Sequence, residues 1–258
     1  MIVAVLLVRT SCVVAVRCPD CGRTPVPYPL STGPKCGHQS YKIRCDAGVL
    51  KFDTINNTYP IISLSPEKQV LVIGQSHFLP NTCVMMADLA TNGIQLNTSL
   101  PFTITTSNTV LYFNCSDTIF VALDCAPTNP CQTYQNTSPQ LSTCRRQAPH
   151  CCSYKPGSTT NLYFIQLMSD RCRAYKSFVN LNMSLPISKW SDPAVELTWA
   201  PPPEPPCATQ SDCDSTSTCK DTQGDTRTCL CKRNLRWDAI TSQCVPGNEK
   251  RLWLEIIF

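Results

Sequence analysis

The chain has 258 residues, of which 19 are cysteine, 22 are proline and only 9 are glycine, and its formal net charge is +4. Thiols stay reduced in the cytosol, so cysteine at this density argues against a cytosolic protein and predicts a disulfide-rich extracellular one. Aromatic residues at 8% and charged residues at 16% are both too ordinary to suggest a disordered chain.

The N-terminus carries an apolar run, residues 1–8, and a second short apolar stretch after a polar break. Small residues suited to signal peptidase follow, so we expect residues 1–16 to be a secretory signal peptide. The alternative is a buried N-terminal strand. Cleavage removes Cys12 and leaves 18 of the 19 cysteines, an even number that allows complete pairing.

The next part of the chain is rich in short β-branched and aromatic runs that are separated by turn-forming residues, a pattern typical of β-strands. The last run alternates apolar and polar residues, as expected for a strand with one buried face. No window repeats at 3.6 residues over three turns, so the predicted fold class is mostly β with little helix. The expected strands are 49–52, 61–64, 70–73, 109–113, 119–123, 162–165 and 195–199.

Twelve cysteines accompany these strands, and their connectivity does not follow from the sequence. Adjacent cysteines rarely bridge each other without strain, so Cys151 and Cys152 are expected to pair elsewhere. The spacing Cys18-x-x-Cys21 also occurs in zinc sites and redox motifs, but structural disulfides are the preferred interpretation. The twelve are Cys18, Cys21, Cys36, Cys45, Cys83, Cys115, Cys125, Cys131, Cys144, Cys151, Cys152 and Cys172.

A proline-rich linker is expected at residues 200–206, where five of seven residues are proline and favour an extended spacer. The following segment, 207–246, has six cysteines with a single residue between the fourth and fifth, and it resembles an EGF-like module. No calcium is expected there, since Glu204 is the only acid just before the first cysteine. Residues 247–258 are expected to be an unstructured tail. The resemblance implies the bridges Cys207–Cys219, Cys213–Cys229 and Cys231–Cys244.

Five Asn-x-Ser/Thr sequons agree with a secretory route, and all lie outside the EGF-like segment. No stretch reaches the 18 or more apolar residues that a membrane span needs. We therefore expect a glycoprotein that is secreted, without a membrane span in this chain. The predicted glycosylation sites are Asn56, Asn97, Asn114, Asn136 and Asn182.

Enzymatic activity is not expected. The chain has only three histidines, and it lacks a Gly-x-Ser-x-Gly elbow, a His-Glu-x-x-His pair and a phosphate-binding glycine loop. No cofactor and no metal ion is predicted, and nucleic acid is an unlikely partner for an extracellular protein.

Basic residues form two clusters, which suit an acidic polysaccharide as partner; the alternative is a solvated basic surface. In the first cluster, between residues 35 and 51, His38 lies near four cations that face one acid. The second, between residues 145 and 176, contains six basic residues and only one acidic residue. The clusters comprise Lys35, Lys42, Arg44 and Lys51, and Arg145, Arg146, Lys155, Arg171, Arg173 and Lys176.

The opening Cys18-Pro19-Asp20-Cys21-Gly22 and the following Val26-Pro27-Tyr28-Pro29-Leu30-Ser31 resemble the galacturonan-binding domain of plant wall-associated receptor kinase-like ectodomains. The match continues through Tyr41-x-Ile43-x-Cys45 and Asn114-Cys115 to the EGF-like tail. The resemblance implies a galacturonan-binding-like β domain at 17–125 and an associated cysteine-rich β segment at 126–199. Relatives are anchored at the plasma membrane and carry a kinase, which is not expected here.

The resemblance also implies binding of pectic polygalacturonate at the cell wall. Arginine offers carboxylates a planar fork, lysine offers a point charge, and aromatic rings stack on sugars. Alternatives are an ectodomain that binds a peptide or co-receptor, and a secreted cysteine-rich defence or inhibitor protein. The candidate polysaccharide-binding residues are Arg23, Tyr28, Lys35, His38, Tyr41, Lys42 and Arg44.

Overall fold

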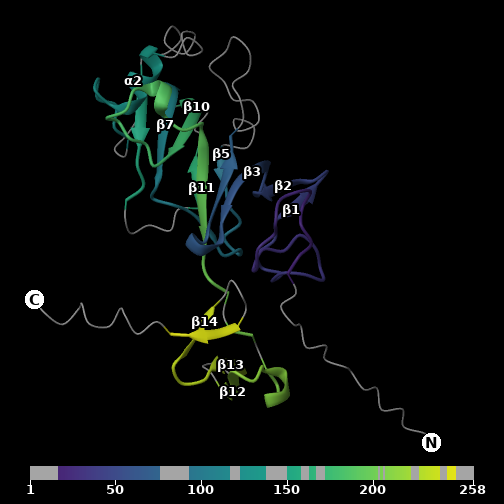
Figure 1. Cartoon of the computed structure of the whole chain (residues 1–258). Helices are drawn as coiled ribbons and strands as arrows, with labels where there is room; N and C mark the ends of the chain where they lie inside the picture. Colours follow the sequence, from purple (N-terminus) through teal and green to yellow (C-terminus); the bar gives the residue numbers. More distant parts are fainter. Residues whose placement is uncertain are drawn as a thin grey trace, which may run out of the picture. The chain divides into compact units, whose positions relative to one another are not determined.

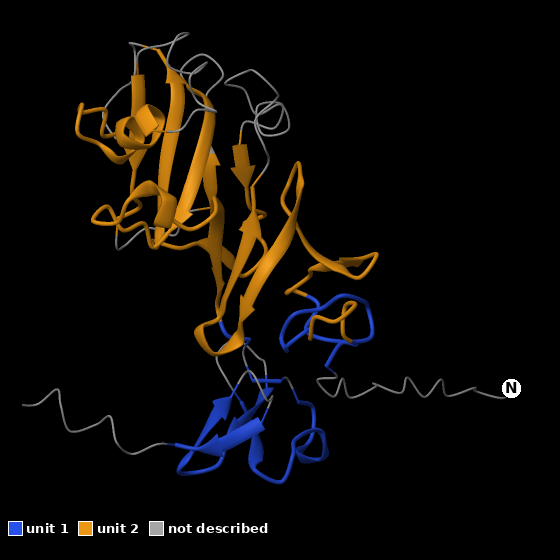
Figure 2. Cartoon of the chain, turned by 45° about the horizontal axis from the view of Figure 1, so that its top comes forward, with its two compact units in different colours: residues 1–19, 26–39, 201–258 blue, residues 20–25, 40–200 orange. Residues whose placement is uncertain are grey.

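The computed structural model divides into two compact units, which Figure 2 colours separately. Unit 1 comprises residues 1–19, 26–39 and 201–258, and unit 2 comprises residues 20–25 and 40–200. The proline-rich stretch therefore begins where unit 2 ends. The structure describes residues 17–75, 93–116, 123–137, 150–157, 163–166, 172–202, 204–205, 207–221, 227–238 and 243–247.

Unit 2 contains an antiparallel six-stranded sheet with the order β1-β2-β3-β4-β11-β6 (Figure 1). The first four strands follow one another along the chain, and the turn from β3 to β4 holds a short 3-10 helix, Pro66–Lys68. Strand β11 is the last strand of unit 2 in the sequence, and it pairs with both β4 and β6. The strands are β1 Arg44–Asp46, β2 Val49–Asp53, β3 Thr58–Ser65, β4 Val70–Gly74, β6 Phe102–Ile104 and β11 Ala194–Trp199.

A second antiparallel sheet has the order β10-β7-β8, formed by Cys172–Val179, Asn108–Cys115 and His150–Tyr154. All eight residues of the central strand β7 are buried, as expected for a strand that is covered on both faces. Cys115 and Cys172 lie opposite each other in register and form a disulfide. A further pair joins β5, Gly93–Gln95, to β9, Phe164–Gln166.

The helix α2, Pro130–Thr137, contacts β8 and β7. It begins with proline at a position where the missing N–H costs nothing. The buried Asn129 caps it, since its Oδ1 accepts a hydrogen bond from the Gln132 N–H at 2.9 Å. Asn129 also donates to the Cys151 carbonyl at 2.8 Å, and this bond ties the helix start to β8.

Two aromatic clusters lie in the core of unit 2. In the first, Phe102 makes edge-to-face contacts with Tyr41, Phe52 and Trp199, at ring-centroid distances of 6.1, 5.0 and 6.5 Å. Such contacts add about 0.5–1.5 kcal/mol each to the burial of the rings. The second cluster extends from the core to the surface, since it joins the buried Phe113 and Phe178 to the partly exposed Tyr134 and Trp190.

The EGF-like segment of unit 1 consists of two short antiparallel hairpins. A 3-10 turn, Gln210–Asp212, precedes them and is held by a capping box between Thr209 and Asp212. Its three disulfides are Cys207–Cys219, Cys213–Cys229 and Cys231–Cys244, the pairing that the resemblance implies. The strands are β12 Ser217–Asp221 and β13 Arg227–Cys231, then β14 Leu235–Asp238 and β15 Gln243–Pro246.

The predicted fold class, mostly β and disulfide-rich, is confirmed: eight disulfides join sixteen of the described cysteines. The expected division at residue 125 does not separate two units, because β10 pairs with β7 and β11 pairs with β4 across it. Strand β10 and helix α2 were not predicted. Residues 1–16, 119–122 and 248–258 lie outside the described residues, as do Cys83 and Cys144. The described part of the chain holds no helix of the length and apolarity that crossing a bilayer requires.

Candidate functional site

Two disulfides organise the N-terminal motif. Cys18 pairs with Cys36 within unit 1, and Cys21 pairs with Cys45 within unit 2. The two sulfurs of Cys18-x-x-Cys21 therefore belong to different bridges. Neither offers a thiolate, so the zinc and redox interpretations of this spacing do not hold. Cys151 and Cys152 likewise pair elsewhere, as predicted, with Cys131 and Cys125.

Gly22 of the motif occupies a position that excludes a side chain. Its φ is +63°, and a Cβ atom would lie 2.6 Å from the carbonyl oxygen of Gly48. Gly37 is similar, with a φ of +62° and a Cβ position 2.3 Å from the Leu30 carbonyl oxygen. Only glycine combines left-handed backbone with such close approach, so both glycines are required by the fold of the motif.

The loop that carries Lys35 is held in place by two polar side chains. The buried Ser31 Oγ lies 2.8 Å from the Gly33 carbonyl oxygen and 2.7 Å from that of Cys36. The Gln39 amide donates to the same two carbonyls at 3.0 and 3.1 Å, and to Ser31 Oγ at 3.1 Å. These bonds turn the loop carbonyls inward, while the Lys35 side chain stays exposed.

Three of the predicted binding cations, Arg23, Lys35 and Lys42, are exposed. Among the described residues, none of the three has a hydrogen-bonded or ion-paired partner. Lys35 belongs to unit 1, whereas Arg23 and Lys42 belong to unit 2. Their charges are available to an anion from solution.

Arg44, a fourth predicted cation, is already engaged. Its guanidinium donates to the Asp53 carboxylate and to Thr58 Oγ1 on the neighbouring strands. Lys51 pairs similarly with Asp46, and this hydrogen bond, followed by the attraction of the charges, holds the pKa of Asp46 below its usual value. An anion that binds Arg44 must therefore compete with a carboxylate of the protein.

The predicted aromatic and imidazole groups differ in exposure. Tyr41 is only 3% exposed, its ring packs on Phe102, and its hydroxyl donates to the Ala200 carbonyl at 2.9 Å. The prediction that Tyr41 stacks on a sugar is therefore wrong, because the ring belongs to the core. Tyr28 is partly exposed. His38 is also partly exposed, and burial lowers its pKa, so it loses its charge at a lower pH than a free histidine.

The second basic cluster is smaller than the sequence indicates. Arg145, Arg146 and Arg171 lie outside the described residues. Lys155 and Arg173 are exposed, whereas Lys176 is buried in β10. Lys176 therefore does not contribute to the basic surface that the sequence predicts for this cluster.

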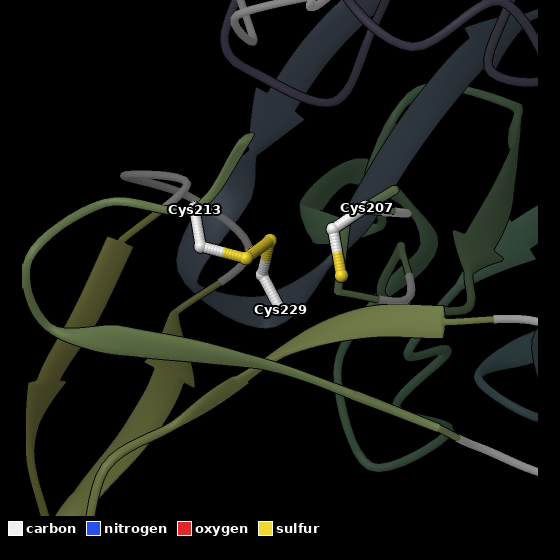
Figure 3. A group of neighbouring side chains, drawn as sticks. All are labelled: Cys207, Cys213 and Cys229. Carbon is white, nitrogen blue, oxygen red and sulfur yellow. A yellow bond between two sulfur atoms is a disulfide. The ribbon is translucent and has the colours of Figure 1, made fainter. Parts of the chain in front are cut away.

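Three sulfur atoms of the EGF-like segment, those of Cys207, Cys213 and Cys229, lie within 4.8 Å of one another. Figure 3 shows the bond that joins the sulfurs of Cys213 and Cys229. Cys207 is bonded to Cys219. Thiolates bind metal ions, and disulfide sulfurs are not thiolates, so this group is a structural crosslink rather than a metal site.

The predicted glycosylation sites also differ in exposure. Asn56, Asn97, Asn136 and Asn182 are exposed. Asn114 lies in the fully buried strand β7, has a φ of +53° and is only 7% exposed. A glycan at Asn114 has no room in the folded chain, so the fold favours the other four sites.

Comparison with known proteins shows what the chain is similar to. Residues 18–75 match the family described as wall-associated receptor kinase galacturonan-binding. The chain is 40% identical over 240 residues to wall-associated receptor kinase-like 15 and 39% identical over 241 residues to wall-associated receptor kinase-like 20, both from Arabidopsis thaliana. No solved structure matches the chain.

The alignments cover 88% of this chain in both cases, but only 37% and 36% of the two relatives. The matched segment contains both N-terminal disulfides, both required glycines and all the candidate binding residues. The resemblance predicted from the sequence is therefore confirmed: the chain is similar to wall-associated receptor kinase-like proteins along most of its length, and its residues 18–75 match the galacturonan-binding family.

Proposed function

We propose that this chain binds de-esterified pectic polygalacturonate at the plant cell wall, as the extracellular part of a receptor-like protein. The observation that carries the proposal is the set of exposed cations Arg23, Lys35 and Lys42, which have no partner among the described residues. They lie within the segment that matches the galacturonan-binding family. The disulfides support an extracellular location, since such bridges persist in oxidising compartments.

The chemistry of the ligand suits these cations. Each galacturonate residue carries one carboxylate unless it is methyl-esterified, so the polymer is a regular array of negative charges. In unit 1, the ammonium group of Lys35 offers the polymer a point charge. In unit 2, the guanidinium group of Arg23 offers a carboxylate of the polymer a planar fork. Tyr28 remains the candidate ring for stacking on a sugar, whereas Tyr41 does not.

The small free energy of an exposed ion pair means that measurable affinity requires several contacts along one polymer. An exposed ion pair contributes about 0.2–1 kcal/mol, so the two pairs that Arg23 and Lys42 of unit 2 can form contribute about 0.4–2 kcal/mol. A dissociation constant of about 1 μM corresponds to about 8 kcal/mol. Single sugars should therefore bind very weakly, and affinity should rise with the length of the oligogalacturonate because further contacts add to one binding event.

The test is a binding titration of the purified protein with oligogalacturonates of defined length, monitored by calorimetry. The triple variant Arg23→Gln, Lys35→Gln and Lys42→Gln should lower the affinity, and salt should weaken the remaining binding. The matched control is Lys68→Gln, which neutralises an exposed lysine outside the candidate set. Equal binding of esterified and de-esterified pectin at about 0.01 M salt, where the Debye length is about 30 Å and the charges are little screened, would contradict the proposal.

A further inference from the structure

We propose that Asn182 carries an N-glycan whose first sugar packs on an exposed apolar patch of unit 2. The patch is formed by Met183, Leu185 and Trp190. This inference concerns a modification and its effect on stability, and it is independent of the binding of galacturonate.

The patch lies directly after β10, in the turn that leads into the 3-10 helix Ile187–Lys189. Met183 is 44% exposed and Leu185 is 45% exposed, which is unusual for large apolar side chains so close together. Trp190 follows the 3-10 helix, and its indole N–H donates to the Leu185 carbonyl oxygen at 3.1 Å. This bond holds the Trp190 ring beside the turn.

Ring contacts with Tyr134 and Phe178 also hold Trp190 in place. Its ring stacks on Tyr134 with a centroid distance of 5.7 Å and an interplanar angle of 9°. It also meets the edge of Phe178 at 5.4 Å. Because Tyr134 and Phe178 immobilise Trp190, its partly exposed surface is a rigid apolar platform, and a sugar that packs on it does not have to order the ring.

Asn182 lies at the border of this patch and has the geometry of an accessible acceptor. It is exposed, and its Oδ1 accepts a hydrogen bond from the Ser184 N–H at 2.9 Å. Its own carbonyl accepts the Leu185 N–H at 3.2 Å, which closes the turn. The Nδ2 atom makes no hydrogen bond among the described residues, so the atom that receives the sugar is available.

The covalent step is the ordinary transfer from a lipid-diphosphate-linked oligosaccharide in the secretory pathway. A bond forms between Asn182 Nδ2 and C1 of N-acetylglucosamine, the bond from C1 to the diphosphate oxygen breaks, and Nδ2 loses one proton. The C–H face and the acetamido methyl group of this sugar are apolar. They cover Met183, Leu185 and Trp190, while the hydroxyl groups stay in water.

The first experiment uses the folded glycoprotein, secreted from a eukaryotic host. Peptide mass spectrometry should find Asn182 occupied. Trimming all glycans to a single N-acetylglucosamine should leave the Tm unchanged, since only the first sugar contacts the patch. In contrast, Ser184→Ala, which abolishes this sequon, should lower the Tm by about 2–4 °C.

The matched control is Ser99→Ala, which removes the sequon at Asn97. Asn97 has the same turn, with its Oδ1 accepting the Ser99 N–H at 3.0 Å, but the described residues place no exposed large apolar side chain in it. The proposal is overturned if Asn182 is unoccupied or if Ser184→Ala lowers the Tm no more than Ser99→Ala does. It is also overturned if trimming to one sugar causes the same loss as Ser184→Ala.

A second pair of variants tests the patch itself. Leu185→Ser should lower the Tm of the glycosylated protein by about 2–4 °C, because the sugar loses part of its apolar contact. In the Ser184→Ala background the same substitution should have almost no effect, since an exposed leucine without the sugar contributes little. Equal effects in the two backgrounds would show that the sugar does not contact Leu185.

Discussion

The fully buried side chain of Asn108 joins three strands of unit 2. Its Oδ1 accepts hydrogen bonds from the Glu196 N–H of β11 at 2.9 Å and from the Ser177 hydroxyl of β10 at 3.3 Å. Its Nδ2 donates to the carbonyl oxygens of Thr105 and Glu196, both at 2.9 Å. Asn108 itself begins β7, so one side chain connects β7, β10 and β11.

Replacing Asn108 with alanine should destabilise unit 2 by about 2–6 kcal/mol. The substitution leaves the Glu196 N–H without its side-chain acceptor and the Thr105 carbonyl without its side-chain donor. Each buried polar group that loses its partner costs about 1–3 kcal/mol. The sum is a large part of the about 5–15 kcal/mol that holds a typical domain folded.

Asn108→Asp keeps the size and shape of the side chain, and it removes the Nδ2 donor while the Oδ1 acceptor is retained. The Oδ1 acceptor remains, but a carboxylate oxygen now faces the two carbonyls of Thr105 and Glu196. Burial and these carbonyls should raise the pKa of the new carboxyl group in the folded state above the unfolded value of about 3.9. The destabilisation should therefore be small below that value and grow as the pH rises through it.

The assay is urea unfolding, followed by tryptophan fluorescence at about pH 3 and about pH 7, below and above the unfolded pKa. The control is Asn180→Asp, at an exposed asparagine just after β10, which should change the free energy of unfolding by less than about 0.5 kcal/mol. If Asn108→Asp and Asn180→Asp are equally stable at pH 7, the hydrogen bonds of Asn108 do not hold the strands together as described.

Three further predictions concern the N-terminal motif. Gly22→Ala should destabilise the protein by about 1–3 kcal/mol, measured as a lower Tm, because its Cβ meets the Gly48 carbonyl; an unchanged Tm would contradict the required glycine. Lys51→Met should raise the pKa of Asp46, measured by NMR titration, since Lys51 lowers it; the stability from this pair is present above the unfolded pKa and lost as the pH falls through the folded value. Ser31→Ala should weaken oligogalacturonate binding a few-fold by loosening the Lys35 loop, and binding equal to the wild type would refute that role.

Local patterns in the sequence were sufficient for several elements. The alternation at 195–199 predicted β11, and the short β-branched runs predicted β2, β4 and β7, because a strand in a half-buried or buried layer selects such residues regardless of its partners. The resemblance of the last six cysteines to an EGF-like module implied the three bridges that the structure contains, since so small a module depends on a fixed set of bridges.

Other features depend on contacts between distant residues. Strand β10 was not predicted because it contains Arg173 and Lys176, and only its place beside β7 makes a strand of it. Tyr41 and Tyr28 look equivalent in the sequence, yet Phe102 and the Ala200 carbonyl draw Tyr41 into the core. Arg44 and Lys42 likewise differ only because Asp53 lies beside Arg44 on the adjacent strand.

The sequence by itself determined the mostly β, cysteine-rich character and the resemblance to wall-associated receptor kinase-like proteins, because composition and short-range spacing carry this information. Only the tertiary structure decided which cations are left for a ligand, which sequon is buried and which strands share a sheet. Those properties depend on contacts between residues that lie far apart in the sequence. The pairing of β11 with β4 and β6 is such a contact.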